Sequence, residues 1–272
     1  KASLVYGGYA GCAYFLPIIG GLICDRWLTR RQAVISGGLI MALGHFLLIF
    51  PALFFPALAT VALGAGLYLP ALPSQIAGLY AQDDPRKSSA YSVYYVGMNL
   101  GSLLSPLVCG TLGELLGWHW GFGAAGIGML IGVGIYSFGA RHLPPDPPPS
   151  ARQATRAPLD REDVRALLLI ALVAAVIVIY RGANEQIGNT LALWLDKGVD
   201  RRIGDFTIPM TWFQSLNPLL VFVLTPIIVG RWVRQAKAQR EATPMRKMAA
   251  GAAMLGAGYV LLAAGAALAG ST

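Results

Sequence analysis

Charged residues are scarce in this chain. Only 12% of its 272 residues are Asp, Glu, Lys or Arg, whereas 56% are hydrophobic. A soluble globular domain carries about 25% charged residues, so half that fraction excludes an ordinary soluble domain. Long hydrophobic runs take the place of the missing charge, and they predict a membrane protein with several spans.

Cysteine is also scarce, with Cys12, Cys24 and Cys109 as the three examples. An odd number of cysteines cannot form a complete disulfide framework, and we expect each to be a small buried hydrophobic side chain. The sequence shows no nucleophile grouped with a histidine and an acid, no zinc-ligand spacing and no phosphate-binding loop. We therefore expect no enzyme, no metal site and no organic cofactor.

Eight hydrophobic segments are each long enough to cross a bilayer, which takes about 20 helical residues. The hydrophobic residues run continuously and do not alternate with a period of two, which favours helices over the strands of a barrel. The sequence therefore predicts an all-α membrane protein. The predicted spans are 3–24, 32–50, 56–80, 90–110, 121–140, 165–193, 206–229 and 247–270.

The net charge of +8 would suggest a nucleic acid partner if the protein were soluble. Here the basic residues gather in alternate loops. If the loop after the first span is cytoplasmic, the outer loops keep only Lys197, Arg201 and Arg202. This pattern follows the positive-inside rule, so we expect a multi-pass protein of the bacterial inner (plasma) membrane and no nucleic acid partner.

A polar, proline-rich stretch at 140–164 favours a semi-rigid cytoplasmic linker. It predicts an N-terminal helical bundle over 1–139 and a C-terminal bundle over 165–272. Asp160 followed by Asp163 predicts a capped start of the next helix. Because the chain starts without methionine and eight spans would place both ends outside, we expect a fragment with further helices on both sides.

Arg181 and Glu185 are the one acid–base pair inside a predicted span, four residues apart on one helical face. A charge at the bilayer centre costs at least about 2.5–3.5 kcal/mol. One interpretation is that the two charges merely neutralise each other, or lie near the outer interface. The other is a carboxylate in a water-filled cavity that takes up and releases a proton during transport.

The segment Gly21-Leu-Ile-Cys-Asp25-Arg26-Trp-Leu-Thr-Arg30-Arg31 resembles the loop motif of the major facilitator superfamily. In that superfamily the motif follows the second helix of the first half. Glycine permits close helix packing, whereas the acid and the arginines pair with neighbouring helix ends and bias the gate. We expect these five numbered residues to act in gating.

Three further segments narrow the resemblance to the proton-dependent oligopeptide transporters. Residues 91–102 resemble that family's aromatic-Tyr-x-x-x-Asn-x-Gly signature, residues 212–218 its eighth-helix motif, and residues 185–188 its seventh-helix glutamate segment. The motifs follow the family order across nearly the whole chain. The resemblance implies the major facilitator fold of two six-helix bundles, with helices two to nine visible here.

The resemblance also implies residue roles. It aligns Tyr14 with a peptide-contacting tyrosine, and Asn99 and Asn217 with side chains that hydrogen-bond the peptide. A buried asparagine in a helix bundle also acts as a link between helices, which is the alternative for Asn99. Tyr68 and Tyr95 either line the cavity or simply pack.

The sequence departs from the family at two informative positions. The fourth-helix lysine of the family is Leu69 here, and the tryptophan that normally precedes the seventh-helix glutamate by four residues is Arg181. The resemblance makes Glu185 the proton-coupling site. We expect Arg181 to replace the missing lysine as the partner of Glu185 and of the peptide carboxylate.

The implied function is symport of di- and tripeptides with protons as the coupling ion, by alternating access, in a protein that acts as a monomer in the lipid bilayer. Leu69 keeps a second hypothesis open, in which the same fold transports nitrate, a drug or another small solute. A receptor that transports nothing, or an intramembrane enzyme, is a third hypothesis, which the missing catalytic grouping disfavours.

Overall fold

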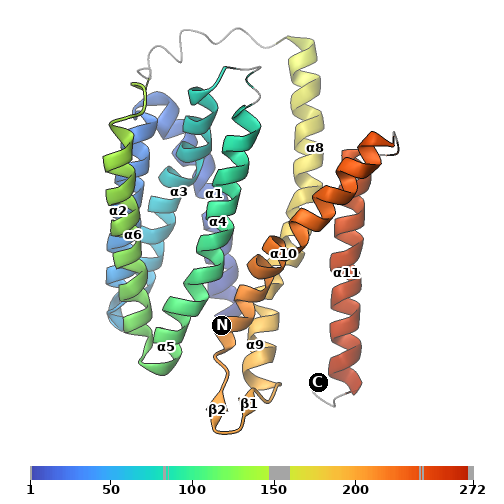
Figure 1. Cartoon of the computed structure of the whole chain (residues 1–272). Coiled ribbons are helices and arrows are strands. Elements are labelled where there is room, and N and C mark those ends of the chain that lie inside the picture. Colours follow the sequence, from blue (N-terminus) through green and yellow to red (C-terminus); the bar gives the residue numbers. More distant parts are fainter. Residues whose placement is uncertain are drawn as a thin grey trace. The chain divides into compact units, whose positions relative to one another are not determined.

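The computed structural model describes residues 2–81, 84, 86–146, 160–238, 240 and 242–268 (Figure 1). Two compact units divide the chain. The first consists of Lys1–Pro158 with Thr211–Ser215, and the second of Leu159–Met210 with Leu216–Thr272.

The regular elements in the described part of the first unit are all helical. Helix α4 continues through a π-helical stretch, Pro106–Gly110, into the short helix α5, and a 3₁₀ turn, Pro51–Leu53, precedes α3. The α-helices are α1 (Ala2–Arg26), α2 (Arg30–Leu47), α3 (Phe54–Leu79), α4 (Arg86–Ser105), α5 (Thr111–Leu115) and α6 (Trp118–Ala140).

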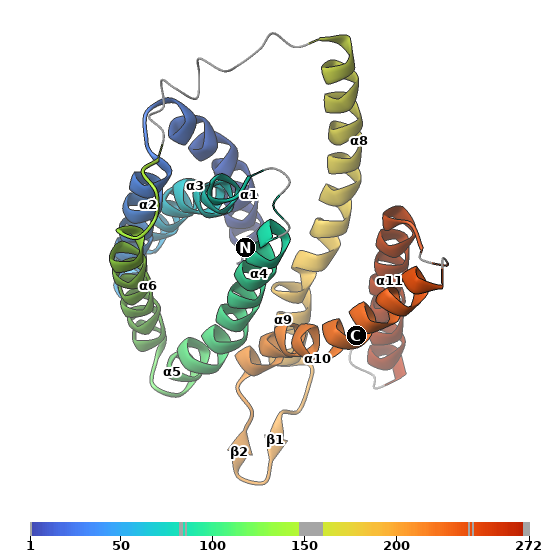
Figure 2. The ribbon, with the colours of Figure 1, turned by 45° about the horizontal axis from the view of Figure 1, so that its top comes forward.

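The second unit combines three long helices with a short hairpin. Strands β1 (Arg202–Ile203) and β2 (Phe206–Thr207) pair antiparallel between α9 and α10 (Figure 2). The helical elements are α8 (Arg161–Asn184), the 3₁₀ turn Glu185–Ile187, α9 (Thr190–Lys197), α10 (Met210–Lys237) and α11 (Pro244–Leu268).

Helices occupy all eight segments predicted to be spans, which confirms the all-α membrane class. Seven helical segments of the described chain are long and apolar enough to cross a membrane. Helix α2 falls outside this set, because its 18 residues include Arg30, Arg31, Gln32, Ser36 and His45.

Two predicted spans differ in detail from the structure. The span 165–193 is interrupted after Asn184, and the span 206–229 begins later, at Met210, because its first residues form β2. The cysteine expectation was wrong for Cys12, which is exposed on α1; Cys24 is buried, as expected, and Cys109 is only partly buried. Lipid-facing and core residues of a membrane helix are equally apolar, so composition could not separate the two.

Side-chain caps define where α2 and α8 begin. Thr29 accepts the Gln32 N–H while the Gln32 side chain accepts the Thr29 N–H, a complete capping box. Asp160 and Asp163 exchange the same two bonds at α8. The capped helix start predicted from this pair of aspartates is therefore confirmed.

Small residues let α3 pack closely against α1 and α2, and α2 also packs against α6 (Figures 1 and 2). A Cβ atom added to Gly20 would lie 2.5 Å from the Gly66 carbonyl carbon, so α1 and α3 touch backbone to backbone there. At Gly21 the nearest atom would be the Pro70 Cβ, at 4.0 Å. The close packing expected of Gly21 therefore falls on its neighbour, Gly20.

The first unit also includes the first turns of α10. Pro106 has no N–H to donate, and the helix widens into the π-helical stretch that follows it. Three hydrogen bonds attach Thr211–Ser215 to this region: Thr211 N–H to Glu114 Oε1 (2.8 Å), Trp212 Nε1 to Thr111 Oγ1 (2.7 Å) and Ser215 Oγ to the Leu103 carbonyl (2.9 Å).

Gly20→Ala should destabilise the protein, because the added methyl group cannot fit against the Gly66 carbonyl. Overpacking of this kind costs about 1–3 kcal/mol. Thermal unfolding in detergent measures the effect, with Gly11→Ala on the same helix as the matched control, since a Cβ at Gly11 meets nothing within 4 Å. Equal melting temperatures for the two variants would contradict the close contact.

Candidate functional site

The structure brings Arg181 and Glu185 together at the end of α8. Arg181 Nη2 lies 3.6 Å from Glu185 Oε1, and the two side chains are 46% and 29% exposed. At this exposure the attraction alone contributes at most about 1 kcal/mol to stability. The pair is therefore suited to exchange partners rather than to hold the fold together.

A break in the helix places Glu185 just beyond α8. Regular α-helix ends at Asn184, and Glu185–Ile187 forms a 3₁₀ turn before α9 begins at Thr190. The sequence analysis treated this region as one continuous helix. The Gly188-Asn189 dipeptide was the available signal, because Gly and Asn are the residues most common where helices end.

A tyrosine from α11 closes this helix end within the second unit. The Tyr259 hydroxyl donates a hydrogen bond of 2.8 Å to the Ala183 carbonyl, two residues before Glu185. The last carbonyls of a helix lack their regular partners within that helix, and the Tyr259 hydroxyl adds a donor from another helix to the Glu185 N–H that this carbonyl already accepts. The sequence analysis missed Tyr259, because its partner lies 76 residues away and no local motif marks it.

Four of the residues predicted to bind substrate lie in the first unit. Tyr14 on α1 and Tyr95 on α4 are exposed. Asn99 donates from Nδ2 to the Tyr95 carbonyl at 2.8 Å, a bond within one helix. Tyr68 is half-buried and packs against the core cluster that contains Val34.

The fifth of these residues, Asn217, is an exposed residue of α10 in the second unit. It follows directly after the turns of α10 that belong to the first unit. Contact of these five residues with a substrate remains a prediction.

The predicted gating residues lie in the last two turns of α1 and the first turn of α2. Asp25 is exposed in the last turn of α1, and the Arg26 guanidinium lies 5.5 Å from the centre of the Trp27 ring. Arg30 reaches the last turn of α3 beside Gly78. A cation at the C-terminal end of a helix is favourable because it complements the helix dipole.

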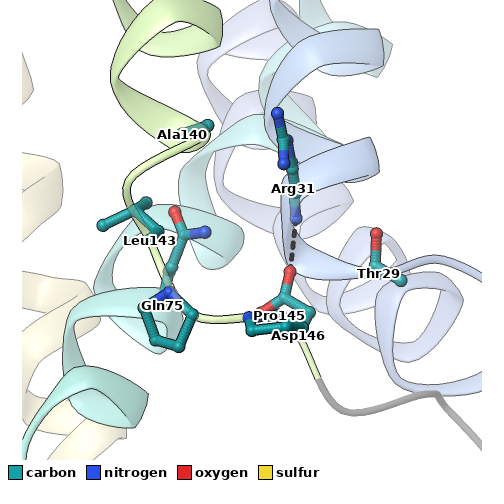
Figure 3. Close-up of a pocket in the computed structure, with 8 residues that line it drawn as sticks. Thr29, Arg31, Gln75, Ala140, Leu143, Pro145 and Asp146 are labelled. Carbon is teal, nitrogen blue, oxygen red and sulfur yellow. Dashed lines mark hydrogen bonds between the residues drawn. The ribbon is translucent and has the colours of Figure 1, made fainter.

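A cavity of about 200 Å³ lies next to Arg31 at this end of the first unit (Figure 3). It is smaller than the roughly 300–1,000 Å³ usual for small-molecule sites, which argues against a substrate site. The residues that line it are Thr29, Arg31, Gln75, Ala140, Leu143, Pro144, Pro145 and Asp146.

A carboxylate of the segment after α6 bonds to the first turn of α2, next to this cavity. Asp146 Oδ2 accepts the Arg31 backbone N–H at 2.8 Å (Figure 3), so a residue of the predicted linker caps α2. On the same side of the unit, the Tyr136 hydroxyl donates to Gln75 Oε1 at 2.8 Å. The start of the linker thereby fixes the helix that carries Arg30 and Arg31.

The connection between α3 and α4 carries a second carboxylate–arginine pair. Asp84 accepts hydrogen bonds from the Arg86 backbone N–H and from its side chain, with Nη2 at 2.8 Å. These hydrogen bonds hold the pKa of the Asp84 carboxyl below its ordinary value. Asp84 therefore stays ionised at neutral pH and caps the start of α4.

Comparison with known proteins gives the class to which this arrangement belongs. The model of the POT family matches residues 31–157 and 149–272. The chain therefore belongs to the POT family, which confirms the family and the fold expected from the motifs. POT transporters are multi-pass membrane proteins, in agreement with the predicted location in a bacterial inner membrane.

Among curated proteins, the chain is 28% identical to the uncharacterized transporter YclF of Bacillus subtilis (strain 168), over 93% of this chain and 63% of that protein. It is 27% identical to the peptide transporter YePEPT of Yersinia enterocolitica subsp. palearctica serotype O:3 (strain YE-P4), over 96% and 65%. The chain thus spans slightly less than two thirds of these relatives.

Comparison with solved structures points to the same family as comparison of sequences. A mutant of the peptide transporter POT in complex with alafosfalin superposes with a TM-score of 0.69 at 26% identity. The match covers 85% of this chain and 59% of that one.

Asp146→Ala should destabilise the first unit, because α2 loses an acceptor at its first turn. Loss of a capping side chain costs about 0.5–2 kcal/mol. Asp146→Asn keeps an acceptor oxygen and should lose less. The measurement is the melting temperature in detergent, and an identical loss in both variants would show that the Arg31 N–H contact does not stabilise α2.

Proposed function

We propose that the protein containing this chain is a proton-coupled symporter of di- and tripeptides that works by alternating access. Membership in the POT family supports transport, and relatives named as peptide transporters support the substrate class. Helical repeats that alternate around a central site are a common plan for secondary transporters.

The observation that carries proton coupling is the ion pair at the helix break. Glu185 and Arg181 are close enough to attract each other and exposed enough to be reached. A peptide carboxylate that binds Arg181 competes with Glu185, and Glu185 then takes up a proton more readily. Each tenfold change in this proton affinity corresponds to about 1.4 kcal/mol, enough to bias which gate closes.

The substitution at the fourth helix supports a role for Arg181. Leu69 lies in α3 and is 44% exposed, and its side chain offers no charge to a substrate carboxylate. Arg181 places a cation beside the Glu185 carboxylate, which the family lysine would otherwise pair with. In this proposal Arg181 replaces the family lysine.

Glu185→Gln should abolish proton-driven accumulation of dialanine by the full-length protein in liposomes. Glutamine cannot take up the proton, whereas the binding site is otherwise kept. We expect concentrative uptake to fall by at least about tenfold while exchange of labelled for unlabelled dialanine stays within about twofold. Accumulation by the variant at the wild-type level would exclude Glu185 as the coupling site.

Arg181→Gln should weaken both dialanine binding and proton coupling, because one cation serves both partners. Arg181→Lys keeps the charge and is the matched control, although it lacks the planar fork of arginine. Uptake as a function of dialanine concentration and pH separates the two effects. Full proton-coupled uptake by Arg181→Gln would refute the replacement of the family lysine.

The alternative function is transport of another small solute, such as nitrate or a drug, and the specific observation in its favour is the uncharged Leu69. Exchange assays with dialanine and nitrate in the same liposomes distinguish the two hypotheses. If the wild type exchanges nitrate and not dialanine, the peptide assignment is wrong.

A further inference from the structure

The carbonyl group of Ala183 is the point where α11 reaches the end of α8. Its oxygen accepts the Glu185 backbone N–H as part of the helix cap, and it also accepts the Tyr259 hydroxyl at 2.8 Å. One carbonyl oxygen therefore joins the backbone of the ion-pair glutamate to a side chain of another helix.

The remaining contact between α8 and α11 is loose on the N-terminal side of this bond. A cavity of about 500 Å³ separates Leu172–Tyr180 of α8 from Met245–Ala252 of α11, and apolar side chains line it. Within the described residues, this space separates the two helices on that side of the hydrogen bond. The Tyr259 hydrogen bond lies beyond the cavity in both helices, next to the helix break.

We infer that Tyr259 is a positioning residue for Glu185: its hydroxyl fixes the turn after α8 and so sets the distance between the carboxylate and Arg181. This inference rests on the proposed proton-coupling role of Glu185. Without the hydroxyl, the Ala183 carbonyl loses its partner from α11, and the turn that starts at Glu185 keeps only the hydrogen bonds of its own segment.

Two groups reach this turn from known positions. Arg181 faces Glu185 from α8, and Tyr259 reaches the turn from α11 through the Ala183 carbonyl. Among the described residues of α9, Asp196 and Lys197 are the charged ones; they lie in its last turn, and Asp196 pairs with Arg201. We expect a change at Tyr259 to act on Glu185 through the Arg181 pair.

The test is an infrared titration of the Glu185 carboxyl in the full-length protein, with the band assigned from the difference between wild type and Glu185→Gln. Tyr259→Phe removes the hydroxyl and keeps the ring. A changed pair with Arg181 should move the midpoint of the Glu185 band away from that of the wild type. Because the pair itself is worth at most about 1 kcal/mol, we expect the change to stay within about fivefold.

The matched control is Tyr136→Phe, which removes a tyrosine hydrogen bond of equal length, to Gln75, in the other unit. It should lower the melting temperature to a similar extent and leave the Glu185 titration unchanged. If Tyr259→Phe behaves in the same way as this control, Tyr259 is merely structural and the inference is wrong.

If the Tyr259→Phe protein does not fold, a second variant provides the test. 3-Fluorotyrosine at position 259 keeps the hydroxyl and makes it a stronger donor, so the midpoint of the Glu185 titration should move in the direction opposite to that of Tyr259→Phe. An unchanged midpoint would overturn the inference. Because the titration needs no transport, it tests the positioning role separately, whereas a wild type without proton-driven uptake would refute the proposed function.

Discussion

A bilayer offers no water to pair a free backbone group, so the protein itself has to close every interruption of a helix. Two interruptions stand out in the described chain. At the π-helical stretch Pro106–Gly110, the nearby Leu103 carbonyl is paired by Ser215, and at the end of α8 the Ala183 carbonyl is paired by Tyr259. Both partners come from segments far away in the sequence. An interruption in lipid therefore ties distant helices together.

Hydropathy predicts where membrane helices lie because a bilayer imposes one length and one chemistry on all of them. For that reason all eight segments were found from the sequence, and the capping pair at Asp160 also fixed the start of α8. The break after Asn184 was missed, since hydropathy averaged over a whole span does not register a change from α to 3₁₀ backbone over three residues. Hydropathy reports composition and does not report backbone geometry.

The candidate site was predictable in its residues and not in its contacts. The spacing of Arg181 and Glu185 was sufficient to predict their ion pair, because residues four apart on a helix are neighbours. The caps from Tyr259 and Asp146 depend on how helices approach each other, and no spacing in the sequence encodes that. The close contact between α1 and α3 was expected at Gly21 and lies at Gly20 instead, since the rotation of α1 about its axis decides which glycine faces α3.

The end of α8 places a cation and an acid of one segment where both can serve in a transport cycle. The Glu185 backbone N–H still donates to the Arg181 carbonyl, so the two residues share the last helical turn, and the 3₁₀ turn begins at Glu185 itself. Their ion pair forms through long side chains, which can turn to other partners without a change in the backbone. The proposed exchange of the family lysine for Arg181 therefore needs only a side-chain rearrangement at a helix end that Tyr259 holds through the Ala183 carbonyl.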